Sequence, residues 1–151
     1  MKRVALVSLG CAKNLVDSEE MLAMFPSDRF ELTSSAKNAD LVIVNTCGFI
    51  NSAKKESIET ILQMASEKNK KAKLVVTGCL AERYAEELRA SIPEADLVVP
   101  LKDYPNLANL LMGLLGEEEI SPMNPLNRLL STAHYSAYLR ISDGCNNFCS
   151  F

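Results

Sequence analysis

Short apolar segments alternate with longer segments of helical periodicity along the first 116 residues. Continuous apolar runs rich in β-branched side chains indicate strands that are buried on both faces of a parallel sheet. We expect such strands at 4–9, 40–45, 74–76 and 97–99, and a weaker strand near 30–33. Strands that alternate with helices predict an α/β fold, here an open, mostly parallel sheet of about five strands flanked by helices in a Rossmann-like arrangement.

The segments between the strands carry apolar side chains at intervals of three and four residues, as amphipathic helices do. We expect a first helix that Pro26 ends, and further helices at about 52–67, 80–91 and 104–115. The buried stripe of the second helix should contain Ile58, Ile61, Leu62 and Ala65. That of the last helix should contain Leu107, Leu110, Leu111 and Leu114, with Gly116 just past its end.

The periodic pattern ends after Gly116. Residues 117–136 begin with a run of glutamates and contain prolines and asparagines, a composition that buries little apolar surface, so we interpret them as a linker. A strand-like run at 137–141 follows. The predicted organisation is therefore one domain at 1–116, the linker at 117–136, and the truncated start of a second domain at 137–151.

Composition limits the classes of function. The chain has 151 residues, a net charge of −3 and 48% hydrophobic residues, which fits an ordinary globular domain. Its slightly acidic balance argues against a nucleic-acid partner bound by phosphate neutralisation. No apolar run has the length of a membrane span or of a secretory signal, so we expect a cytoplasmic protein with no membrane partner.

Three of the five cysteines occupy equivalent positions. Cys11, Cys47 and Cys79 each lie just past a predicted buried strand, beside a glycine and before a helix. Loops at the carboxyl ends of parallel strands meet at one edge of the sheet, and helix N-termini stabilise thiolates. The sequence therefore predicts one site built from three thiolates.

Several ligands fit such a site. Three thiolates suit zinc or an iron–sulfur cluster, and the choice depends on the fourth ligand. His134 is the only histidine and lies far from the three loops in sequence. A four-iron cluster held by three cysteines would instead leave one iron open to a non-protein ligand. Without a metal, the cysteines would be small packing residues and the domain a partner-binding module.

The other two cysteines, Cys145 and Cys149, are four residues apart near the end of the chain. A further cysteine directly after Phe151 would complete the three-cysteine motif of enzymes that reductively cleave S-adenosylmethionine at a four-iron cluster. By itself the pair also fits half of a zinc ribbon or a redox-inactive pair.

Four segments together resemble the radical S-adenosylmethionine methylthiotransferases. They are SLGCAKNLVDSE at 8–19, NTCGFI at 45–50, TGCLA at 77–81 and SDGCNNFC at 142–149. Within this family, Ala12 and Lys13 after the first cysteine are similar to the branch that modifies a ribosomal protein. The transfer-RNA branch, which usually has Gln-Met there and acts on a modified adenosine, is the alternative.

The resemblance implies a cofactor for each group of cysteines. Cys11, Cys47 and Cys79 would bind an auxiliary 4Fe-4S cluster, whose open iron holds a sulfur or methylsulfide group. Cys145 and Cys149 would be two of the three ligands of a second 4Fe-4S cluster, the one that cleaves S-adenosyl-L-methionine.

The resemblance also implies a three-domain enzyme, of which this chain is the amino-terminal domain and the first part of the radical barrel. Its reaction would place a methylthio group on the β-carbon of one aspartate of a small-subunit ribosomal protein, with electrons from a donor. Because the third ligand of the second cluster follows Phe151, we expect the chain alone to be inactive, and we assign it no catalytic side chain.

Polar residues near the cysteines have simpler expected roles. Asn14, Asp17 and Ser18 would cap the first helix, with positioning of the cysteine loop as the alternative. Asn45 and Thr46 would tie the second loop to its neighbours through hydrogen bonds.

Overall fold

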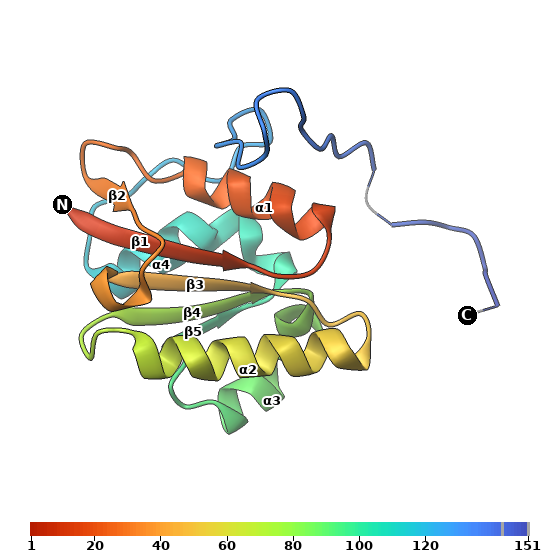
Figure 1. Ribbon diagram of the computed structural model, residues 1–151, viewed down its shortest axis with the longest axis horizontal. Helices are drawn as coiled ribbons and strands as arrows, with labels where there is room; N and C mark the ends of the chain where they lie inside the picture. The colour runs from red at the N-terminus through yellow and green to blue at the C-terminus, as the bar shows by residue number, and fades with distance from the viewer. Residues whose placement is uncertain (143, 151) are drawn as a thin grey trace.

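The structure of the chain, a computed structural model, describes residues 1–142 and 144–150. Its centre is a five-stranded sheet with the order β2-β1-β3-β4-β5, in which every pair of neighbours is parallel (Figure 1). This is the strand order of flavodoxin-like doubly wound sheets, and it confirms the predicted α/β class. The strands are β1 at Lys2–Ser8, β2 at Phe30–Leu32, β3 at Leu41–Thr46, β4 at Lys73–Gly78 and β5 at Leu97–Val99.

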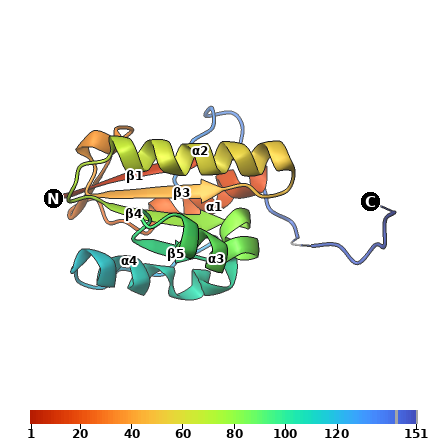
Figure 2. The same ribbon diagram turned by 90° about the horizontal axis from the view of Figure 1, so that it is seen from below.

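Helices cover both faces of the sheet (Figures 1 and 2). The strand side chains alternate: Leu41 and Ile43 of β3 pack into the core on the side of α1 and α4, and Val42 and Val44 into the core on the side of α2 and α3. All of β3 is therefore buried, as its continuous apolar run predicted. The helices are α1 at Ala12–Ala23, α2 at Asn51–Glu67, α3 at Cys79–Ser91 and α4 at Leu107–Leu115, with 3-10 turns η1 at Ala36–Asn38 and η2 at Leu101–Asn106.

The predicted buried stripe of α2 is partly wrong. Ile61 is fully buried, but Ile58 and Leu62 are 40% and 47% exposed, and Ser57 is buried instead. The helix lies with Ser57 toward the loop that follows β3, where its hydroxyl group bonds to the backbone of Cys47. With the helix in this rotation, Ile58 and Leu62 lie at the solvent boundary, while Met64 and Ala65 pack against the core.

The last helix begins later than predicted, at Leu107 rather than at Tyr104. Pro105 lies in the preceding 3-10 turn, where its missing N–H group is tolerated better than inside an α-helix. The buried face of α4 consists of Leu107, Ala108, Leu111 and Met112, so Leu110 and Leu114 are only partly buried.

After Gly116 the described residues form no helix or strand, which fits the predicted linker but not the predicted strand at 137–141. No described strand lies beside 137–141 to complete a hydrogen-bonded ladder, and a strand requires such a partner. Asp143 and Phe151, which belong to the motifs discussed above, lie outside the described residues. Within the described ranges, no helix has the length and apolar character needed to cross a membrane.

Candidate functional site

The three cysteine loops leave adjacent strands at the same edge of the sheet. In the strand register, Ser8 of β1 pairs with Asn45 of β3, and Asn45 pairs with Thr77 of β4. Cys11, Cys47 and Cys79 come two or three residues after these aligned positions. From β1 the chain first adds β2 on one side of the sheet and then β3, β4 and β5 on the other side. The point between β1 and β3 is therefore the topological switch point, where ligands of doubly wound sheets bind.

Gly10 gives the Cys47 side chain its space. Gly10 has a φ of +90°, and a Cβ atom there would lie 2.6 Å from the Cβ and 2.9 Å from the Sγ of Cys47. Both the backbone conformation and this close approach exclude other residues. The first cysteine loop therefore lies directly against the second.

Asn14 contacts all three loops and is almost completely buried. Its Nδ2 atom donates hydrogen bonds to the carbonyl oxygens of Leu9 at 2.8 Å and Thr46 at 2.9 Å. Its Oδ1 atom accepts a hydrogen bond from the Cys79 thiol at 3.7 Å. The N-cap of α1 is Cys11, which makes no side-chain cap bond, so the capping role predicted for Asn14 is wrong and the positioning alternative is confirmed.

Asp17 and Ser18 do not cap α1 either. Ser18 donates a hydrogen bond to Ser8 at 2.9 Å and accepts one from Nδ2 of Asn45 at 2.9 Å. The same Asn45 amide donates to the backbone carbonyl of Asn14 at 2.9 Å. These bonds join β1, β3 and α1 next to the cysteine loops, and only the Oδ1 atom of Asn45 is buried without a hydrogen-bond partner among the described side chains.

Thr46 makes the connection to the third loop. Its hydroxyl group donates to the carbonyl oxygen of Thr77 on β4 at 2.5 Å. The prediction that Asn45 and Thr46 tie the second loop to its neighbours is therefore confirmed.

Ser57 is a site residue that the sequence reasoning missed. Its hydroxyl group donates to the carbonyl oxygen of Cys47 at 2.8 Å and accepts the N–H group of the same residue at 3.0 Å. One buried side chain thus holds both backbone groups of a candidate ligand. The available signal was a serine four residues before Ile61, on the buried face of a helix.

The three thiols are free and differ in exposure: Cys11 is exposed, whereas Cys47 and Cys79 are partly buried. Burial raises the pKa of the Cys79 thiol, and the nearby Cys47 and Cys11 raise it further, while Lys13 opposes them. Without a metal, Cys79 is therefore a neutral thiol at pH 7. Because binding a metal requires the thiolate, it would release this proton.

The donor set, three thiolates, fits an iron–sulfur cluster and also a zinc ion. Thiolates are the usual ligands of such clusters, and the space that Gly10 leaves open holds the Cys47 sulfur. In the described part of the chain, no three His, Cys, Asp or Glu side chains are gathered closely enough to hold one metal ion. His134 is exposed, and its ring contacts the ring of Tyr135. Among the described residues it is not gathered with the cysteines as a fourth zinc ligand would be.

Cys145 and Cys149 are both exposed and belong to a segment without helix or strand. The N–H group of Asn147 donates to the Cys145 sulfur at 3.4 Å. In Figures 1 and 2 the segment that carries them extends away from the domain, so the structure does not bring them to the three-cysteine edge.

Comparison with known sequences extends this picture. Residues 3–100 match the family described as uncharacterized protein family UPF0004. The ribosomal protein uS12 methylthiotransferase RimO of Caldicellulosiruptor saccharolyticus is 44% identical, over 100% of this chain and 37% of the relative. The enzymes of the same name from Clostridium botulinum and Geobacter sulfurreducens are 48% and 44% identical, over 99% of the chain and 36% of each relative.

The chain thus spans little more than a third of the length of the curated relatives that it matches. Their names confirm the resemblance to the methylthiotransferases and do not favour the transfer-RNA alternative. The family match covers β1 to β5 and all three strand-end cysteines. The chain therefore belongs to the protein family UPF0004.

Proposed function

We propose that this chain is the cluster-binding, amino-terminal part of an enzyme that adds a methylthio group to ribosomal protein uS12. The observation that carries the proposal is the convergence of three cysteine loops on Asn14 at the switch point of the sheet. The names of the relatives supply the substrate. Because that substrate belongs to the ribosome, we place the protein in the cytoplasm.

In this proposal Cys11, Cys47 and Cys79 hold an auxiliary 4Fe-4S cluster. When bound, that cluster supplies an iron atom with an open position for a sulfur ligand. Residues of this chain favour the ionised form of the cysteines and hold them in position. Cys11 and Cys79 lie at the N-termini of α1 and α3, where the helix dipoles favour negative charge. Ser57 and Asn14 keep the Cys47 backbone and the Cys79 thiol in place.

Cys145 and Cys149 are the second part of the proposal. They would be two of the three ligands of another 4Fe-4S cluster, which binds S-adenosyl-L-methionine and takes electrons from a donor protein. In the reaction, a methylthio group replaces a hydrogen atom on the β-carbon of an aspartate of uS12. With only two of the three ligands for that cluster, the chain by itself should not catalyse this reaction.

Anaerobic reconstitution with iron and sulfide tests the cluster assignment. We expect the chain to bind about four irons and to absorb in the visible range as iron–sulfur proteins do. Replacing Cys11, Cys47 or Cys79 singly by Ala should remove most of this iron, because two thiolates do not retain the cluster.

The double change of Cys145 and Cys149 to Ala is the matched control and should leave the iron content nearly unchanged. The opposite pattern, with iron lost in the double variant and kept in the three single variants, would overturn the assignment of the cysteines to sites.

A chimera tests the substrate. In it, this chain replaces the corresponding residues of the Caldicellulosiruptor saccharolyticus relative, and mass spectrometry of uS12 measures the added methylthio group. We expect the chimera to modify uS12 and its Cys47→Ala variant to leave uS12 unmodified. Modification of transfer RNA in place of uS12 would refute the proposed substrate.

A further inference from the structure

Helix α1 carries three carboxylates that are almost completely buried. Asp17, Glu19 and Glu20 are 2%, 1% and 3% exposed. Acidic side chains are rarely buried to this degree unless they are paired, because removing a charge from water is costly. Asp17 pairs with Lys13 on the same helix at 3.3 Å. The arginine partners of the three carboxylates lie more than a hundred residues later in the chain, in the segment that the sequence predicted to be a linker and a new strand.

Glu19 binds the first part of this segment, residues 128–131. Its Oε2 atom accepts the Arg128 guanidinium group, at 2.5 Å from Nη2 and 3.2 Å from Nε. Its Oε1 atom accepts both the N–H and the hydroxyl group of Ser131 at 2.7 Å. The backbone carbonyl of Glu19 also accepts the N–H group of Leu129 at 3.2 Å. Both carboxylate oxygens are therefore satisfied by one short stretch of chain.

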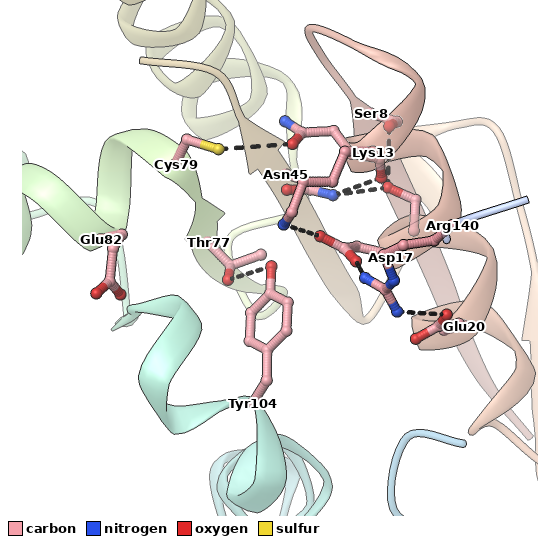
Figure 3. Close-up of polar contacts among 12 residues, drawn as sticks. Ser8, Lys13, Asp17, Glu20, Asn45, Thr77, Cys79, Glu82, Tyr104 and Arg140 are labelled. Atoms are coloured by element: carbon pink, nitrogen blue, oxygen red, sulfur yellow. Dashed lines mark hydrogen bonds and ion pairs between the residues drawn. The ribbon is translucent and has the colours of Figure 1, made fainter. Parts of the chain in front are cut away.

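Arg140 attaches the second part of the segment to α1. Its guanidinium group bridges two carboxylates, at 2.5 Å from Asp17 and 2.8 Å from Glu20 (Figure 3). Arg128 connects the two parts, because its Nη1 atom also donates to the carbonyl oxygen of Tyr138 at 2.7 Å. A single guanidinium group that bonds two acceptors fixes the direction of the chain as well as its position.

We propose that the Asp17, Glu19 and Glu20 face of α1 is a docking surface for residues 128–140 of the same chain, and that this docking positions the Cys145–Cys149 pair. Cys145 is the fifth residue after Arg140, so even a fully extended chain keeps Cys145 within about 18 Å of Arg140. Asp17 is the sixth residue after Cys11, the N-cap of α1, which corresponds to about 9 Å along the helix axis. The docked arginine therefore limits how far the second cysteine pair can move from the first cysteine.

The direction of the chain agrees with this role. The C-terminal segment leaves the domain on the side toward which the strand arrowheads point, where the three cysteine loops lie (Figures 1 and 2). The docking itself rests only on the contacts above. The role that we assign to the docking, which is to bring two cluster sites to one side of the domain, depends on the proposed function.

A distance measurement on the iron-free chain tests the proposal. Spin labels are attached to Cys11 and Cys145 after Cys47, Cys79 and Cys149 are changed to Ser. We expect one narrow distance distribution, which the changes Arg128→Gln and Arg140→Gln together broaden at least twofold. The control Arg89→Gln, which removes an ion pair to the exposed Glu86 within α3 and a hydrogen bond to the carbonyl oxygen of Val98, should leave the width unchanged.

Hydrogen exchange of the chain with all its cysteines gives a second measurement that does not depend on the labels. The N–H groups of Leu129 and Ser131 should exchange at least tenfold faster in the double arginine variant. Unchanged distance widths and exchange rates would overturn the docking. A chain that shows both effects but binds no iron would keep the docking and refute the proposed function instead.

Discussion

At the scale of single residues, one buried amide organises the cysteine edge. Asn14 has two donor hydrogens and one acceptor oxygen, and each of the three loops uses one of these contacts. A serine or aspartate at this position could not donate twice from the same atom. The side chain thus reaches a cysteine 65 residues later in the sequence.

We predict that Asn14→Ala lowers the free energy of unfolding by about 1–3 kcal/mol, because the carbonyl groups of Leu9 and Thr46 lose their buried donor. Urea denaturation at neutral pH measures this change. Asn109→Ala is the control, because Asn109 lies on the exposed face of α4 and bonds only to Asn106 among the described residues. If both variants unfold at the same urea concentration, Asn14 does not hold the loops together.

The sequence located the cysteines but not the residues that position them. Cys11, Cys47 and Cys79 follow from local pattern, because each comes just after an apolar run. The roles of Asn14 and Ser57 depend on which strands are neighbours and on how far α2 is rotated. Neither the order of the strands nor the rotation of α2 can be read from a few neighbouring residues. Local sequence therefore favoured helix capping as the role of Asn14, and this prediction was wrong.

At the scale of elements, α1 shows why a hydrophobic stripe is an incomplete guide to burial. Val16 and Met21 are buried, but Asp17, Glu19 and Glu20 are buried as well. Their cover comes from residues 128–140, which have no periodicity of their own. In contrast, Ile58 and Leu62 of α2 have apolar helical spacing but lie at the solvent boundary.

Glu19 makes the stability of α1 depend on pH. Burial opposes its ionisation, but the bonds from Arg128 and Ser131 outweigh this effect and hold its pKa below the ordinary value of 4.5. The ionised form is thus favoured in the folded state. Its contribution is complete above about pH 4.5 and is lost as the pH falls through the lower folded-state pKa.

We therefore predict that the difference in unfolding free energy between the wild type and Glu19→Gln is largest near pH 7 and shrinks below pH 4.5. Denaturation curves at a series of pH values measure it. The control Glu118→Gln removes a carboxylate that is 95% exposed and should show no such trend. A difference that stays constant down to pH 3 would mean that the charge of Glu19 does not stabilise the fold.

At the scale of the whole molecule, the boundary of the folded unit differs from the boundary of the periodic sequence pattern. The last helix ends at Leu115, and composition alone indicates a linker after Gly116. Yet the contacts of Arg128, Ser131 and Arg140 satisfy carboxylates inside the domain. Long-range pairing of charges cannot be read from composition, so the fold was predictable from the sequence but its full extent was not.

This boundary leads to a prediction about truncation. A chain that ends at residue 127 leaves Asp17, Glu19 and Glu20 without their arginine partners, whereas a chain that ends at residue 140 keeps both arginines. Leaving a charge buried without its partner costs about 3–5 kcal/mol, but the truncation also removes the cover and lets water reach the carboxylates, so the shorter chain should be less stable by no more than about this amount. Chemical denaturation of both chains at pH 7 measures the difference. Both lack Cys145 and Cys149, so the comparison isolates residues 128–140. Equal stability would show that the folded unit ends at α4 and that the carboxylates find water or other partners when the segment is absent.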